Sequence, residues 1–119
     1  MRDHTKLRAF QLADELALAV YRATAEFPKN EQFGLTSQMR RAAVSIPSNI
    51  VEGAARSTEA EFLRFLDIAY GSARELEYQV SLSQRLGFLQ QHDAESLTGT
   101  CVETSKVIGG LIRSFRRGD

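Results

Sequence analysis

The sequence predicts an all-α protein that folds as an up-and-down antiparallel four-helix bundle, with residues 1–119 forming a single domain. Apolar residues recur at intervals of three and four in four separate segments, which is the spacing that gives an α-helix one buried face. The connections 28–36, 54–57 and 88–92 are short, and short links place consecutive helices antiparallel in space. No segment shows the alternation typical of a β-strand. A chain of 119 residues buries roughly two-thirds of its unfolded surface, enough for a core without metals or disulfides.

The first helix is predicted from about Thr5 to Phe27 and the second from about Ser37 to Glu52. In the first segment the helical spacing continues until Pro28, which cannot continue a helix. Thr36 precedes the second segment and suits an N-cap, because its hydroxyl can accept a hydrogen bond from a free backbone N–H. Gly53 follows the segment and suits a C-terminal cap.

The third helix is predicted to be the longest. Thr58 and Glu61 have the spacing of a capping box, so we expect the helix to begin there and to end at about Arg85 to Gly87. Asp93 is a suitable N-cap for the fourth helix, whose apolar residues keep one face as far as Phe115.

The composition is that of a globular domain rather than a disordered one. Charged residues make up 25% of the chain, two prolines occur, and the formal net charge is zero. The single cysteine excludes an internal disulfide. No apolar run approaches the roughly 20 residues of a membrane span, and the first ten residues, MRDHTKLRAF, lack the apolar stretch of a signal peptide. We therefore expect a cytoplasmic protein that does not engage a membrane.

A stripe of polar residues follows the second predicted helix on the side away from its apolar residues. We call this stripe the polar seam, and it consists of Gln38, Arg41, Ser45, Asn49 and Glu52. Pro47 lies in the same helix and lacks a backbone N–H, so we expect a kink or a restart there, with Ser45 capping the restart. Glu52 lies at the negative end of the helix dipole, where a cation is favourable, and Arg56 is the nearest one. The polar seam has three interpretations: a solvated face with a local ion pair, a contact between subunits, or a site for a nucleic-acid or protein ligand.

The third predicted helix has more apolar surface than one bundle needs. Ile68, Leu82 and Leu86 lie well away from its core side when residues advance by about 100 degrees each. Scattered exposed apolar residues are normal, but recurrence on a single side favours an interface. We therefore predict a homo-oligomer.

Glu77 falls among the core positions of the same helix. A carboxylate there must either pair with a cation or reach solvent at the rim of the bundle. Arg40, at the edge of the apolar side of the second helix, is one partner, and an exposed Glu77 at the rim is the alternative.

Positive charge is unevenly distributed along this neutral chain. The candidate contacts to nucleic-acid phosphates are Arg40, Arg41, Arg56, Arg113, Arg116 and Arg117. The alternative is that these arginines belong to solvated helix faces. Oligomerisation would strengthen a small basic patch by repeating it, because repetition raises the local field and adds avidity.

The residues do not indicate catalysis, and we expect neither an enzyme nor a cofactor or metal. His4 lies near the terminus and His92 in a turn, so neither offers a positioned base. Cys101 has the spacing of a buried core residue. No cysteine and histidine cluster has zinc spacing, and no Glu-x-x-His pair of a di-iron bundle occurs. The Gly109-Gly110 pair is expected to permit close helix packing.

The segment LTSQMRRAAVSIPSNIVEGAARS, followed by FLRFLDIAYGSARELE, resembles the signature of the small bacterial four-helix-bundle proteins encoded in intervening sequences of 23S ribosomal RNA genes. The resemblance covers most of the chain, from FPKNEQFGLTSQ through LGFL. In its first half the matching residues are Gln38, Arg41, Ser45, Ile46, Pro47, Asn49, Ile50, Glu52 and Gly53. In its second half they are Phe65, Leu66, Ala69, Gly71, Ser72, Glu75 and Glu77.

The resemblance carries expectations about assembly and partners. The family is related to accessory proteins of diversity-generating retroelements, which form ring-shaped pentamers, bind nucleic acid and partner a reverse transcriptase. The resemblance therefore implies that this chain forms a homopentamer. We expect a non-enzymatic interaction scaffold that contacts copies of itself and a protein partner, and the alternative is an RNA- or DNA-binding accessory protein.

Overall fold

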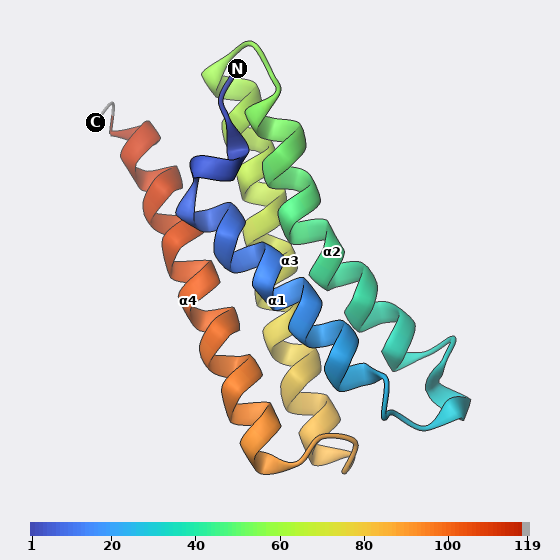
Figure 1. Cartoon of the computed structure of the whole chain (residues 1–119). Helices are drawn as coiled ribbons and strands as arrows, with labels where there is room; N and C mark the ends of the chain where they lie inside the picture. Colours follow the sequence, from blue (N-terminus) through green and yellow to red (C-terminus); the bar gives the residue numbers. More distant parts are fainter. Residues whose placement is uncertain (118–119) are drawn as a thin grey trace.

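The computed structural model describes residues 1–117 and confirms an antiparallel four-helix bundle (Figure 1). The helices are α1 (Arg8–Thr24), α2 (Leu35–Ala54), α3 (Glu59–Arg85) and α4 (Gln91–Arg116), and the described residues contain no strand. Each helix packs against its neighbours in the order α1, α2, α3, α4, and α4 packs back on α1. The bundle is elongated, with extents of 45 × 22 × 19 Å. None of the helices in this part of the chain combines the length and apolar character needed to cross a membrane.

The predicted first helix is wrong at both ends. Residues His4–Lys6 form a short 3₁₀ turn, because the Asp3 carboxylate accepts a hydrogen bond from the Thr5 backbone N–H at 3.0 Å. Helix α1 ends at Thr24, yet Phe27 is buried, and its ring centroid lies 5.6 Å from that of Phe88. Phe27 therefore continues the apolar pattern from a loop that folds over the end of the bundle.

Helix α2 begins two residues earlier and ends two residues later than predicted. Thr36 is not the N-cap; it is buried in the first turn, and the Glu31 carboxylate instead accepts a hydrogen bond from the Leu35 backbone N–H at 3.0 Å. Gly53 is not a C-cap either, because α2 continues to Ala54 and Ala55 is its C-cap. A Cβ atom at Gly53 would lie 2.8 Å from Cβ of Phe65. Glycine is needed at this position for the close approach of α2 to α3.

Pro47 does not interrupt α2, so the predicted restart is wrong. Ile46 and Ile50 flank the proline and are fully buried, and their packing holds the helix together across the missing hydrogen bond. Ser45 therefore has no restart to cap.

Both ends of α3 agree with the prediction. The Thr58 hydroxyl accepts a hydrogen bond from the Glu61 backbone N–H at 3.2 Å, which confirms the capping box. The C-terminal end is closed by hydrogen bonds from Gly87 to Gln84 and from Phe88 to Ser83, and Gly87 has φ of 84°. This pattern is a Schellman motif, which requires a left-handed residue that only glycine adopts easily.

The fourth helix begins at Gln91 with Gln90 as its N-cap, so the prediction that Asp93 caps it is wrong. Asp93 lies in the first turn, where its charge is favourable to the helix dipole. The core between the four helices includes the fully buried Phe62, Leu66, Leu76 and Cys101.

Candidate interaction site

The polar seam lies along the outer face of α2, beside a groove between α2 and α3. We call it the α2–α3 groove; its volume is about 410 Å³ and its lining residues are Gln38, Arg41, Ala42, Ser45, Ser72 and Glu75. Three residues of the polar seam thus line the groove, and Glu52 lies outside it. Ser72 and Glu75 were not predicted as site residues, because nothing in the sequence of α2 shows which residues of α3 lie opposite.

Hydroxyl groups connect the two helices across the floor of the α2–α3 groove. Oγ of Ser45 lies 2.9 Å from Oγ of Ser72, and the Asn49 amide donates hydrogen bonds to the Ser45 carbonyl at 2.7 Å and to its hydroxyl at 3.0 Å. Each of these polar side chains is half-buried and has a partner. Ser45 and Asn49 thus belong to the bundle's own hydrogen bonding.

The charges of the polar seam have no partner within the described residues. Arg41 and Glu52 are both exposed and form no ion pair there. The predicted pair of Glu52 with Arg56 is wrong, because the Arg56 guanidinium lies over the ring of Phe65, 5.0 Å from its centroid. This cation–π contact draws Arg56 toward α3.

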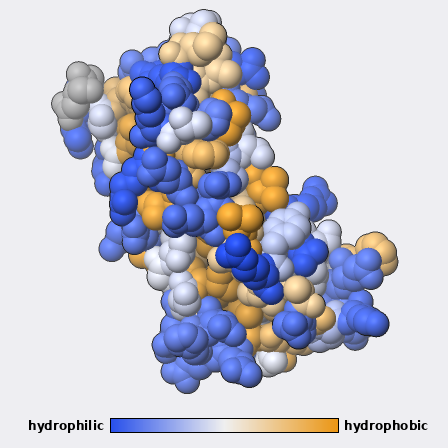
Figure 2. All heavy atoms as spheres, in the orientation of Figure 1, coloured by the Kyte–Doolittle hydropathy of each residue, from blue (hydrophilic) through white to orange (hydrophobic). Residues whose placement is uncertain are grey.

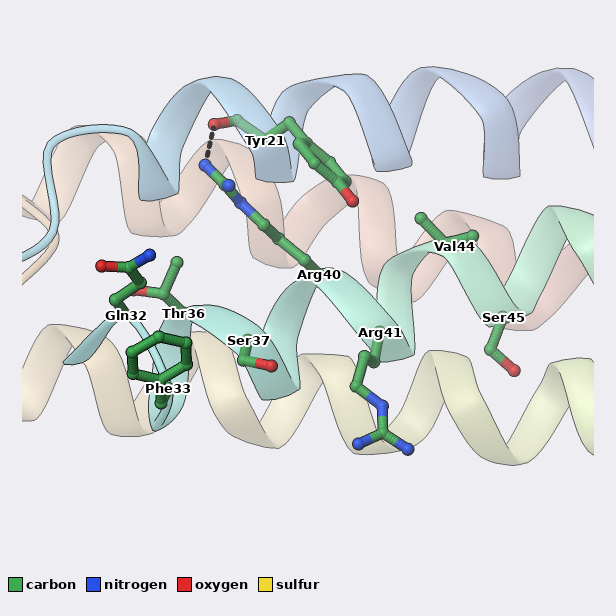
Figure 3. A pocket seen from close by; sticks show the side chains of 9 residues that line it. All are labelled: Tyr21, Gln32, Phe33, Thr36, Ser37, Arg40, Arg41, Val44 and Ser45. Atoms are coloured by element: carbon green, nitrogen blue, oxygen red, sulfur yellow. Dashed lines mark hydrogen bonds between the residues drawn. The ribbon is translucent and has the colours of Figure 1, made fainter.

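Arg40 and Arg41 are adjacent in sequence but point in opposite directions (Figure 3). The Arg40 guanidinium reaches α1, where it donates to the Thr24 hydroxyl at 2.9 Å and lies 4.5 Å from the ring centroid of Tyr21. Arg41 points toward α3. A second groove, of about 620 Å³, lies on the α1 side of α2 and is bordered by Tyr21, Arg40 and Val44.

Exposed apolar residues occur on both sides of the bundle. Figure 2 shows hydrophobic residues breaking the hydrophilic surface on the face that α1 covers. On α3, Ile68 and Leu86 are 43% and 53% exposed, as predicted, whereas Leu82 is half-buried against the core. The sequence analysis missed Phe33, which is 91% exposed in the loop before α2.

The six candidate arginines do not form one basic patch. Arg40 is held by α1, Arg56 lies over Phe65, and the Arg116 guanidinium donates to the Asp67 carboxylate at 2.8 Å. Arg117 lies just past the end of α4, and its backbone N–H donates to the Arg113 carbonyl. These arginines thus contact different helices and side chains, and they do not combine into one surface for phosphates.

Arg113 instead lines a groove on the opposite side of α3. We call it the α3–α4 groove; its volume is about 270 Å³ and its lining residues are Tyr70, Arg74, Glu77, Val102, Ser105, Lys106, Gly109 and Arg113. Glu77 is at the rim, with its side chain one-third exposed and its Oε1 3.6 Å from Nε of Arg74. Arg40 as its partner is therefore wrong, and the exposed alternative is correct.

Cys101 is fully buried behind this groove. Burial, and secondly the negative charge of Glu77, raise the pKa of its thiol to about 12. The thiol is thus protonated at neutral pH and is not an activated nucleophile. Among residues 1–117, no three histidine, cysteine, aspartate or glutamate side chains gather in a way that could hold a metal ion.

Fold and grooves together define the class: a small antiparallel helical bundle whose grooves lie on its outer faces. Residues 5–110 match the sequence model of the 23S rRNA-intervening sequence protein family. The chain belongs to this family. No curated protein sequence matches the chain.

One solved structure supports the fold independently. It is described as a protein with unknown function from the S23 ribosomal protein family of Bacteroides thetaiotaomicron VPI-5482. The two share 24% sequence identity with a TM-score of 0.81, and the alignment covers 88% of this chain and 95% of the other. At this identity the likeness establishes the fold alone, and neither the description of the family nor that of this neighbour names a catalytic activity.

Proposed function

We propose that the chain is a non-enzymatic, homo-oligomeric bundle that acts as an interaction scaffold, with copies closing into a ring. The observation that carries this proposal is Arg41, whose guanidinium borders the α2–α3 groove without a partner in residues 1–117. An arginine at a groove commonly recognises a carboxylate on a partner surface. The number five follows only from the resemblance to the retroelement accessory proteins.

The same side of the bundle offers what a second copy needs. Glu52 is unpaired at the other end of the polar seam, so one helix face presents a cation and an anion about three turns apart. Ile68 and Leu86 supply exposed apolar area on α3 beside it. Head-to-tail contacts between such complementary patches generate a ring when the rotation closes.

Gly71 supports close approach of another helix to α3. It is exposed within the helix, and a Cβ atom added there would meet nothing within 4 Å. A glycine in an exposed helix costs about 1 kcal/mol relative to alanine, and nothing within the chain requires it. A second copy packed against this stretch of α3 would benefit from the missing side chain.

The test is the mass of the assembly in solution, measured by size-exclusion chromatography with light scattering. Arg41→Glu should raise the subunit dissociation constant by at least about 30-fold, because reversing one partner of a desolvated pair leaves two like charges together. Arg22→Glu is the matched control: Arg22 is an exposed arginine of α1, away from the polar seam. Combining Arg41→Glu with Glu52→Arg should restore assembly where these two side chains meet across the interface.

Two results would remove the proposal. A wild-type protein with the mass of one chain at micromolar concentration would exclude the ring. An Arg41→Glu variant that assembles as the wild type does would mean that the polar seam is a solvated helix face and not a subunit contact.

Nucleic-acid binding is the second candidate, and Arg113 is the observation that favours it. Its side chain has no ionic partner within residues 1–117, and a ring would repeat it in every copy. Binding through phosphates would weaken steeply as salt rises, whereas a scaffold with apolar contacts would respond far less.

A further inference from the structure

The α3–α4 groove has an excess of positive charge that the chain does not balance. Arg74, Lys106 and Arg113 line it together with one carboxylate, Glu77, so two positive charges remain uncompensated. Residues 70, 74 and 77 follow the helical spacing on α3, and residues 102, 106, 109 and 113 follow it on α4. The cations therefore belong to two facing stripes that border one groove.

The carboxylates one turn away are already engaged elsewhere. Asp67, one turn before Tyr70, pairs with Arg116, and Glu103, one turn before Lys106, pairs with Arg8. Neither is among the residues that line the groove. The positive charge in the groove is thus a local feature of a chain whose net charge is zero.

Ser105 contributes a hydroxyl that lacks a partner. It lines the groove at 6% exposure, and its Oγ is buried without a hydrogen bond. Leaving a buried hydroxyl unbonded is unfavourable, and serines inside helices commonly bond the carbonyl four residues earlier. Rotation about the Cα–Cβ bond would turn this covered Oγ toward the groove, where an acceptor oxygen from a bound molecule would supply the missing bond.

Gly109 gives the groove its room. A Cβ atom there would lie 3.3 Å from Nη1 of Arg113 and 3.5 Å from Cε2 of Tyr70. The absence of a side chain at Gly109 therefore leaves space between the Tyr70 ring and the Arg113 guanidinium. The hydroxyl of Tyr70 also accepts a hydrogen bond from Arg74 at 3.2 Å, which fixes that guanidinium at the groove.

We propose that the α3–α4 groove binds a phosphate group. A phosphate presents several acceptor oxygens, and the donors here are two guanidinium groups, one ammonium and one hydroxyl. Two uncompensated positive charges match a phosphate monoester dianion or two consecutive phosphodiesters. The volume of about 270 Å³ lies below that of pockets for drug-sized ligands, so it suits a phosphate group rather than a whole cofactor. The site is complete in one chain and does not depend on the proposed ring.

Titration calorimetry with inorganic phosphate tests the site in the full-length protein. Arg113→Gln and Ser105→Ala should each weaken binding by about tenfold, since each removes a donor to a charged ligand. Arg116→Gln is the matched control, because Arg116 lies on the same helix but is paired with Asp67. Glu77→Gln should tighten binding severalfold, because it removes the only carboxylate that lines the groove.

A pair of glycine variants tests the shape of the groove without changing its charge. Gly109→Ala should weaken phosphate binding, since the added methyl group occupies space beside Arg113 and Tyr70. Gly99→Ala is the matched control on α4, because its Cβ would meet nothing within 4 Å. Far-UV circular dichroism of each variant establishes that the helices are intact.

The source of the phosphate is distinguished by a second titration with a short structured RNA and with a nucleoside monophosphate. Tight RNA binding that Arg113→Gln weakens, with a reduced salt dependence, identifies backbone phosphates. Preference for the monophosphate identifies a small phosphate monoester. The proposal is overturned when neither these probes nor inorganic phosphate binds, or when Arg116→Gln weakens binding as much as Arg113→Gln does.

Discussion

The two grooves that flank α3 are built in opposite ways. In the α2–α3 groove the serine hydroxyls bond each other, and the lining includes one cation, Arg41, and one carboxylate, Glu75. In the α3–α4 groove three cations surround one carboxylate, and the hydroxyl of Ser105 is unbonded. The lining of the first holds equal numbers of positive and negative side chains, whereas the lining of the second has an excess of positive charge.

This difference indicates what kind of partner each groove suits. A groove lined by one cation and one carboxylate is complementary to another protein surface, including a copy of the same chain, because Arg41 and Glu75 can each meet an opposite charge there. An unbalanced groove needs an anion that the chain does not contain. Measurements of unfolding free energy, ligand binding and pH dependence can each test this difference between the two grooves.

The largest effect is expected from two buried glycines: Gly53, where α2 packs against α3, and Gly109, in the α3–α4 groove. Gly53→Ala should lower the free energy of unfolding by about 1–3 kcal/mol, because the new Cβ would lie 2.8 Å from Phe65 and 3.0 Å from Phe62 and must displace them. Gly109→Ala should instead raise it by up to about 1 kcal/mol, since alanine favours a helix and the Arg113 side chain can move aside. Urea unfolding at one protein concentration measures both.

Opposite signs of the two changes in the free energy of unfolding would distinguish a tight helix contact at Gly53 from an open groove at Gly109. Gly99→Ala on α4 is the control for helix propensity alone, because a Cβ there would meet nothing within 4 Å. Destabilisation by Gly109→Ala as large as that by Gly53→Ala would mean that α3 and α4 are packed as tightly there as α2 and α3 are at Gly53.

The roles of such glycines could not be predicted from the sequence. The bundle, the four helices and the capping box at Thr58 followed from periodicity and local capping chemistry, and all are confirmed. Gly53 and Pro47 were misinterpreted, because local rules treat glycine and proline as helix breakers. Packing against α3 explains Gly53, and the buried Ile46 and Ile50 keep the helix intact at Pro47. The sequence of one helix does not specify which residues lie opposite it.

The grooves were predictable only in part for the same reason. The polar seam was visible because all its residues lie on one helix with a regular spacing. The α3–α4 groove could not be recognised in the sequence, because Arg74 and Lys106 lie far apart in the chain, on two different helices. Only the antiparallel pairing of α3 with α4 places them on one groove.

A smaller effect is expected from the serine hydroxyls. Ser45→Ala should lower the free energy of unfolding by about 1 kcal/mol, because it removes the hydroxyl that bonds Ser72 and one of the two hydrogen bonds of the Asn49 amide. Ser105→Ala should be neutral or stabilising, since its hydroxyl has no bond to lose. Thermal or urea unfolding without phosphate compares them, and Ser72→Ala closes a double-mutant cycle with Ser45→Ala. An equal loss in the free energy of unfolding for Ser45→Ala and Ser105→Ala would contradict the difference between a hydrogen-bonded hydroxyl in the α2–α3 groove and an unbonded one in the α3–α4 groove.

The smallest effect concerns the thiol behind the α3–α4 groove. Because burial and Glu77 raise the pKa of Cys101 to about 12 from an ordinary value of 9.0, the folded chain retains a proton that the unfolded chain loses first as pH rises. The unfolded state then binds fewer protons, so stability falls with rising pH between these two values. At pH 9 half of the unfolded thiols are ionised, and the loss is about 0.4 kcal/mol. Comparing Cys101→Ala with wild type at pH 7 and pH 9 isolates this contribution from other titrating groups. An identical pH dependence in both proteins would mean that the thiol ionises as readily in the bundle as in the unfolded chain, so that water reaches the inner wall of the α3–α4 groove.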